Sequence, residues 1–238
     1  MFEFKLFSKK KKLDLPKGIF FCGMLGVGKT KLVNELMDVL CKYKYTKISE
    51  FKTQKELDEL YKALRNHDFK KQRNIVFRNN LYLMNRIVET INNPNQNFIC
   101  DCLPLGEVFI GAFMNNFAES KNKFDVLNMY EYMVLKFEKE VTKNNISNDE
   151  LKNMCFVLLK NKHSKYQFYY RKIATEYIPY ELYDDFEKHF ILVLQRFGQY
   201  LRSREIKFLE FDTTKFDVES DDFKEFFIEK VLVKKIID

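Results

Sequence analysis

One stretch of this sequence has the residue types and spacing of a site that binds a polyphosphate. The stretch reads Gly23, Met24, Leu25, Gly26, Val27, Gly28, Lys29 and Thr30. In a loop of this pattern the glycines let backbone N–H groups turn toward the phosphates, and the lysine reaches the β- and γ-phosphates. The threonine hydroxyl ligates Mg²⁺. We therefore expect residues 23–30 to bind a nucleoside polyphosphate together with Mg²⁺.

The segments on either side of this loop are the ones that such a loop requires. Residues 18–22 form a short apolar run typical of a buried strand, and residues 31–45 carry apolar side chains at helical spacing. A helix that begins at the loop places its positive end against bound phosphate. A chance match of the glycine pattern is the alternative, but the strand, loop and helix order makes it the weaker one.

The rest of the chain alternates short apolar runs with helical patterns. Further strands are predicted at 45–49, 97–100, 154–159 and 206–211. Helices are predicted at 52–64, 69–91, 104–117, 124–143, 164–174, 180–204 and 221–237. This alternation predicts an α/β fold with a parallel sheet covered by helices on both faces. The run at 154–159 is wholly apolar, and we expect it at the centre of the sheet.

Composition limits the class of protein. The chain has 238 residues, a net charge of +7 that comes mainly from lysine, and apolar runs too short for a membrane span. We expect a basic tail at 1–16 and a single domain at 17–238. Because the lysines are spread along the chain, no nucleic-acid partner is expected.

The five cysteines are odd in number and lie within apolar runs, which favours reduced thiols in an intracellular protein. A cytoplasmic location is the first expectation, and a mitochondrial one stays open. Two of them form the segment Cys100-Asp101-Cys102, which lacks the two further ligands of a zinc site and has no histidine nearby in sequence. Metal binding by thiols is therefore not expected.

Two carboxylates follow predicted strands: Glu50 after 45–49 and Asp101 after 97–100. Ligands of open α/β sheets bind at the carboxyl ends of the strands, so both should lie near the loop. Phosphoryl transfer needs a carboxylate for Mg²⁺ and a base near the acceptor hydroxyl, and these two residues supply one of each. Alternatively, Glu50 is only a helix-entry carboxylate and Asp101 only a strand-end cap.

Taken together, these features resemble the deoxynucleoside kinases and their thymidylate-kinase-like relatives, of which this chain looks like a divergent member. The similarity covers most of residues 18–238 as spaced motifs. It implies a three-layer P-loop kinase fold with a five-stranded parallel sheet and a short lid. It also implies transfer of the γ-phosphoryl group of ATP, with Mg²⁺, to the 5′-hydroxyl of a deoxynucleoside.

The resemblance gives roles to residues of the acceptor pocket. Glu50 takes the proton from the 5′-hydroxyl, although the family's following proline is Phe51 here. Asn79 stands, as a shorter amide, at the position of a base-reading glutamine. Arg86 matches an arginine seven residues later, and Glu107 matches the acid that pairs with it. Arg86 also has a purely structural interpretation as a solvated helix residue.

At the phosphate side the sequence departs from the family. Asp101 matches the acid of an acid-Arg-Ser/Thr motif and would bind Mg²⁺ with Thr30, but the motif's arginine is Cys102 and its hydroxyl residue is Leu103. Cations at this kind of position contribute about 10³ to 10⁵ in rate in other phosphotransferases. The resemblance therefore implies a weakened kinase unless another cation compensates.

The lid is also reduced. The family's arginine-rich segment aligns with 166–176, where Arg171 and Lys172 are the cations. Lys172 falls on the last lid arginine, and Arg171 would replace part of what Cys102 removes by swinging over the γ-phosphate. Glu176 is near the acid that holds the sugar 3′-hydroxyl. Alternatively, Arg171 and Lys172 are only an exposed charged pair.

Three functions therefore stay open: a deoxynucleoside kinase, a deoxynucleoside monophosphate kinase, and a kinase-derived nucleotide-binding or structural subunit. Arg78 is the nearby cation that would face an acceptor phosphate in the second case. The expected partners are a nucleotide and a small nucleoside, with no nucleic acid and no membrane. By resemblance, residues 104–143 would supply the surface of a homodimer.

Overall fold

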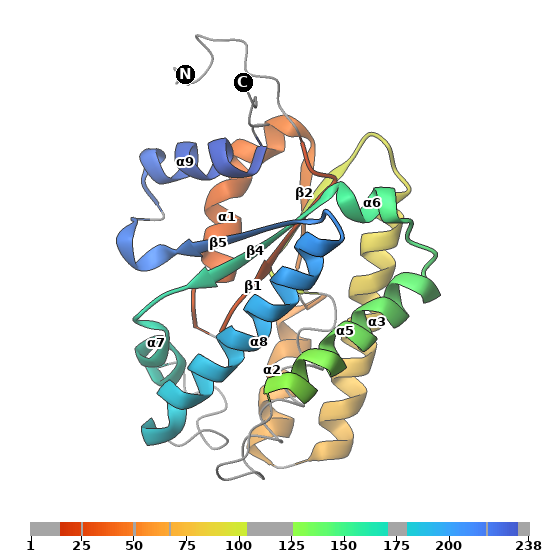
Figure 1. Cartoon of the computed structure of the whole chain (residues 1–238). Coiled ribbons are helices and arrows are strands. Elements are labelled where there is room, and N and C mark those ends of the chain that lie inside the picture. Colours follow the sequence, from red (N-terminus) through yellow and green to blue (C-terminus); the bar gives the residue numbers. More distant parts are fainter. Residues whose placement is uncertain are drawn as a thin grey trace.

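Five parallel strands form one sheet in the spatial order β2-β3-β1-β4-β5 (Figure 1). The computed structural model describes residues 15–24, 26–49, 51–66, 68–103, 126–170, 180–217 and 219–232. The strands are β1 (Gly18–Cys22), β2 (Tyr45–Ile48), β3 (Asn97–Cys100), β4 (Met154–Lys160) and β5 (Lys207–Asp212). The predicted five-stranded parallel sheet is therefore confirmed.

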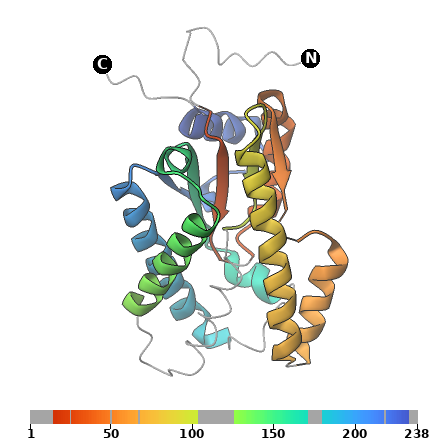
Figure 2. The same ribbon diagram turned by 90° about the vertical axis from the view of Figure 1, so that its right-hand side faces the viewer.

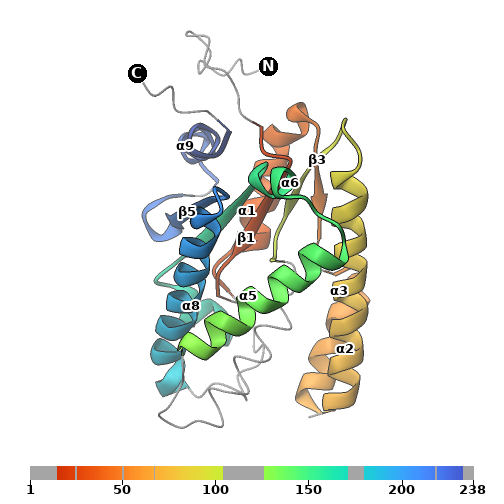
Figure 3. The ribbon, with the colours of Figure 1, turned by 45° about the vertical axis from the view of Figure 1, so that its right-hand side comes forward.

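Helices cover both faces of the sheet, so the fold has three layers (Figure 3). One face carries α1 (Lys29–Leu40) and α9 (Asp221–Leu232), and the other carries α3 (Phe69–Ile91), α5 (Val126–Lys143) and α8 (Tyr183–Ser203). A further helix, α2 (Gln54–Arg65), lies along α3 (Figure 2). The shorter elements are α6 (Asn148–Lys152), α7 (Ser164–Tyr170) and the 3₁₀ turns Cys41–Tyr43, Tyr180–Leu182 and Thr213–Lys215.

The central strand β1 shows why the sheet is buried on both faces. Successive side chains of a strand point to opposite faces, so Ile19 and Phe21 join the core under α1 and α9, whereas Phe20 joins the other core. Phe20 stacks on Phe156 of β4 with ring centroids 4.9 Å apart and meets Phe98 of β3 edge-on at 5.2 Å. This double burial explains the continuous apolar runs of the strands.

The predicted elements agree with the described ones except in a few places. The wholly apolar run that forms β4 does not take the centre of the sheet, because β1 lies there and β4 lies between β1 and β5. Both strands are buried on both faces, so their apolar composition does not show which of them takes the central place in the sheet. The helix predicted from 180 begins as a 3₁₀ turn and becomes α-helical at Tyr183. The helix predicted at 104–117 lies outside the described residues.

A local signal fixes the start of α6. Ser147 accepts a hydrogen bond from the backbone N–H of Glu150, and the Glu150 carboxylate accepts one from the backbone N–H of Ser147. This reciprocal pair of hydrogen bonds is a capping box. Hydrogen bonds from the Ser147 hydroxyl and backbone lower the pKa of the Glu150 carboxyl.

Among the described residues, no helix has the length and apolar character that a membrane span needs.

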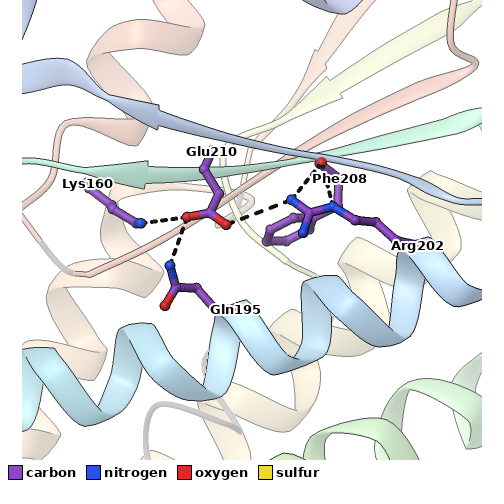
Figure 4. A network of polar contacts seen from close by, with 5 residues as sticks. All are labelled: Lys160, Gln195, Arg202, Phe208 and Glu210. Atoms are coloured by element: carbon purple, nitrogen blue, oxygen red, sulfur yellow. Dashed lines mark hydrogen bonds and ion pairs between the residues drawn. The ribbon is translucent and has the colours of Figure 1, made fainter.

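A polar network ties the outer strand β5 to β4 and α8 (Figure 4). Glu210 of β5 accepts hydrogen bonds from Lys160 at 2.5 Å and from Gln195 at 2.9 Å, and Arg202 lies 3.8 Å from its other oxygen. Arg202 also donates to the backbone oxygen of Phe208. Burial raises the pKa of Glu210, but these hydrogen bonds and the two cations outweigh it and hold the pKa below its usual value.

This network predicts a pH-dependent contribution to stability. Because the pKa of Glu210 is lower in the folded state, its stabilisation is present above the unfolded value of about 4.3 and is lost as pH falls through the folded pKa. We expect Glu210→Gln to lower the free energy of unfolding near neutral pH by about 1 kcal/mol or less. The difference should shrink in urea denaturation from about pH 7 to about pH 3.5. Glu131→Gln, at an exposed position of α5, is the control; an equal loss at every pH would contradict the assignment.

Candidate nucleotide-binding site

The loop between β1 and α1 has the backbone conformation that a phosphate cradle needs. Gly23, Gly26 and Gly28 have φ angles of 137°, 83° and 94°, values that residues with a Cβ rarely adopt. At Gly23 a Cβ would lie 2.5 Å from the backbone oxygen of Leu159 on β4. At Gly26 it would lie 3.0 Å from the backbone nitrogen of Phe168 on α7. Backbone geometry favours glycine at all three positions, and close contact with neighbouring elements also requires it at positions 23 and 26.

Lys29 is the first residue of α1, and Gly28 is its left-handed N-cap. The Lys29 ammonium donates hydrogen bonds to the backbone oxygens of Gly23 at 3.0 Å and Met24 at 2.9 Å, so the side chain folds back over the loop. The positive end of α1 and the ammonium therefore lie on the same side of the loop, which favours an anion there. Thr30 follows in the first turn of α1 and is exposed.

Gly23 and Gly28 differ in the space around their Cβ positions, and this difference can be tested. Gly23→Ala should damage the loop strongly, because the new Cβ would meet a backbone oxygen that cannot move aside, in addition to backbone strain of about 1–3 kcal/mol. Gly28→Ala should suffer the strain alone, since no atom lies within 4 Å of its Cβ position. Thermal unfolding and ATP titration calorimetry of both variants check this. A larger loss in Gly28→Ala would contradict the described loop.

Asp101 lies at the same edge of the sheet as the loop. β1 and β3 are neighbours with Phe20 opposite Cys100, so the loop leaves β1 beside the point where Asp101 follows β3. Asp101 is only 4% exposed. The topology therefore brings together the loop and one of the two predicted carboxylates. The other one, Glu50, lies outside the described residues, as does Leu25 of the loop.

The predicted acceptor pocket is described in part. Asn79 lies on α3 with 5% exposure, and its amide oxygen has no hydrogen-bond partner within the described part of the chain. Arg86, two turns further along α3, is exposed and forms an ion pair with Glu89 at 3.1 Å. Its predicted partner Glu107 lies outside the described residues, and the Arg86–Glu107 pair stays a prediction. The lid residues Arg171, Lys172 and Glu176 also lie outside them.

The two departures from the kinase motif are buried. Cys102 is 4% exposed and Leu103 is 7% exposed, and both belong to the apolar cluster between the sheet and the helices α3, α5 and α8. A side chain at position 102 is therefore part of the packed interior. This burial suits an apolar thiol at position 102, where the resemblance predicts an arginine.

The structure adds a feature that the sequence did not indicate: α7 packs against the loop between β1 and α1. The backbone oxygen of Ser164 and the backbone nitrogen of Phe168 both lie near 3 Å from the Cβ position of Gly26. Ser164 is fully buried and donates a hydrogen bond of 2.5 Å to Glu187 of α8. Burial raises the pKa of Glu187. Because this packing joins residues far apart in sequence, no local pattern signals it.

Comparison with known proteins agrees with this fold. No protein-family model and no curated protein matches the chain. Among solved structures, deoxyadenosine kinase from M. mycoides with bound dCTP matches with a TM-score of 0.51 and 16% identity, covering 90% of this chain and 98% of that one. The same enzyme with dCMP and dCDP bound gives a TM-score of 0.49 and 17% identity, covering 90% and 97% of the two chains. The chain therefore has the three-layer P-loop fold of a deoxynucleoside kinase.

Proposed function

We propose that this protein is an ATP-dependent kinase that phosphorylates the 5′-hydroxyl of a deoxynucleoside. The observation that carries the proposal is the loop at the end of the central strand, with Lys29 folded over it at the start of α1. A loop of this kind is used to hold the phosphates of a nucleotide during phosphoryl transfer. The fold shared with deoxyadenosine kinase supports the same choice.

The residues around the loop are suitable for Mg²⁺. Thr30 supplies an exposed hydroxyl in the first turn of α1, and Asp101 supplies a carboxylate at the neighbouring strand end. Oxygen ligands of this type, together with substrate phosphates, are what Mg²⁺ prefers. When bound, the ion neutralises charge that develops on the phosphates. Lys29 positions the phosphoryl group, and Glu50 is proposed as the base for the acceptor hydroxyl.

A nucleoside acceptor is favoured over a monophosphate by which side chains of α3 are buried and which are exposed. Asn79 is buried, whereas Arg78, the cation that would face an acceptor phosphate, is exposed. A buried amide whose oxygen has no hydrogen-bond partner among the described residues is suited to hydrogen bonding with a base. The second candidate is a catalytically weakened or structural subunit. The buried thiol of Cys102 favours it, because this position carries no cation.

One experiment separates these functions. The purified protein is incubated with ATP and Mg²⁺ and each of the four deoxynucleosides or their monophosphates, while ATP affinity is measured by calorimetry. We expect phosphorylation of at least one deoxynucleoside. Transfer to monophosphates alone would support the second enzyme class. ATP binding without transfer to any acceptor would support a structural or regulatory subunit and overturn the proposal.

A further inference from the structure

Two thiols and a carboxylate meet at the end of β3. The sulfur atoms of Cys100 and Cys102 lie 3.6 Å apart, and both lie within 4.8 Å of a carboxylate oxygen of Asp101. All three residues are buried, with exposures of 0%, 4% and 4%. Successive residues of a regular strand point to opposite faces, but the chain bends at Asp101 and Cys102, which lets the three groups gather on one side.

We propose that Cys100, Asp101 and Cys102 form a binding site for a thiophilic divalent cation of the Zn²⁺ type. Two sulfurs that each lie 2.3 Å from one tetrahedral ion are about 3.8 Å apart, which is close to the observed 3.6 Å. A disulfide would require the same atoms to approach to about 2.05 Å. The observed spacing is too long for a disulfide; it is that of a thiol–thiol hydrogen bond and also lies close to the separation that a shared metal ion requires.

The chemistry of the donors selects the ion. Thiolates favour soft or borderline cations, whereas Mg²⁺ and Ca²⁺ require oxygen ligands. Three protein ligands leave the fourth tetrahedral position for water or a phosphate oxygen, as in open zinc sites. Binding converts both thiols to thiolates and releases two protons, so the bound cluster carries one net negative charge and its affinity rises with pH.

The strand pairing holds the first ligand in place. Cys100 is opposite Phe20 of β1 and Ile48 of β2, so its backbone is fixed on both sides. Asp101 and Cys102 follow directly and carry little freedom of their own because they are buried. A ligand that strand pairing already holds in place loses less conformational entropy when the site binds an ion.

The site has a functional consequence that rests on the proposed kinase activity. Asp101 is the carboxylate proposed to serve Mg²⁺, and a cation held by the two thiolates would take the same carboxylate. Zn²⁺ should therefore inhibit phosphoryl transfer without competing with the deoxynucleoside. A chelator that binds Zn²⁺ in preference to Mg²⁺ should restore activity. Zn²⁺ binding does not depend on the proposed kinase activity, and binding and inhibition are measured separately.

The test is titration of the full-length protein with Zn²⁺, with a phosphine reductant present so that the thiols stay reduced. Equilibrium dialysis with elemental analysis gives the stoichiometry, and Co²⁺ in place of Zn²⁺ gives a thiolate-to-metal absorption band in the near ultraviolet. We expect one ion per chain in the wild type. Cys100→Ala and Cys102→Ala should each weaken binding at least about 100-fold, and Asp101→Asn should weaken it by about 10- to 100-fold.

Two further cysteine variants serve as matched controls. Cys155→Ala removes a thiol that is equally buried but faces the other core, and Cys41→Ala removes an exposed one. Both should bind Zn²⁺ like the wild type. No binding to the reduced wild type, or full binding in the double variant Cys100→Ala/Cys102→Ala, would overturn the proposal. Zn²⁺ binding in a protein that phosphorylates nothing would uphold the site while refuting the kinase.

Discussion

Lys29→Ala is expected to abolish most of the turnover of this protein while leaving its fold in place. Removing a single group that stabilises charge in a transition state costs about 10²- to 10³-fold in rate. The same ammonium binds phosphate in the ground state, and a charged hydrogen bond contributes about 1.5–3 kcal/mol, so ATP affinity should fall about 10- to 100-fold. Steady-state phosphoryl transfer and ATP calorimetry measure the two effects.

The control for this experiment is Lys31→Ala, two residues further along α1. Lys31 is exposed and forms an ion pair with Glu219, away from the loop oxygens that Lys29 contacts. Its removal should change neither turnover nor ATP affinity beyond about twofold, because exposed ion pairs contribute little. Since Lys29 also binds loop carbonyls, thermal unfolding of both variants must be recorded. Unchanged turnover in a folded Lys29→Ala would show that the loop does not serve phosphoryl transfer.

Phe156→Ala is expected to give the largest loss of stability. The ring is 1% exposed, stacks on Phe20 at 4.9 Å and contacts Phe137 and Phe197 edge-on at 6.1 and 6.5 Å. Its removal leaves a cavity between the sheet and the helices α5 and α8, and such truncations cost about 3–5 kcal/mol. Urea denaturation followed by circular dichroism measures the change in the free energy of unfolding.

Phe77→Ala on α3 is the matched truncation, because that ring is 69% exposed. Its loss should lie within about 0.5 kcal/mol, as for most surface substitutions. Equal losses in the two variants would contradict the described core. If Phe156→Ala does not fold, Phe156→Leu keeps most of the volume and should show a smaller loss of the same sign.

The parts of the fold that the sequence predicts are those specified by short-range patterns. The loop at 23–30 is recognisable because glycine positions, an apolar run before it and helical spacing after it all agree. The helix at 69–91 is predicted with its observed bounds, because it is long and strongly periodic, and Asp68 accepts a hydrogen bond from the N–H of Lys71 at its start. Agreement between local signals is what makes such elements predictable.

The parts that the sequence does not predict depend on contacts between distant residues. The sequence of Cys100-Asp101-Cys102 alone does not indicate a metal site, because it offers too few metal ligands. Only the bend after β3 brings its three donor groups together. The burial of Cys102 likewise follows from the apolar cluster that α3, α5 and α8 form with the sheet. Consequently, introducing an arginine at position 102 would bury a charge, which is costly without a partner.

The position of β1 in the sheet also affects how the protein is made. This strand is the first of the five in the sequence, yet its two neighbours are β3 and β4, and the second of these ends only at Lys160. At typical rates of synthesis of about 5–20 residues per second, the apolar strand Gly18–Cys22 waits roughly 7 to 30 seconds for its last partner. Both of its edges are open to other chains until β3 has been made, and the edge that pairs with β4 stays open for the whole interval. The apolar strand β1 is therefore exposed to aggregation while the rest of the sheet is being made.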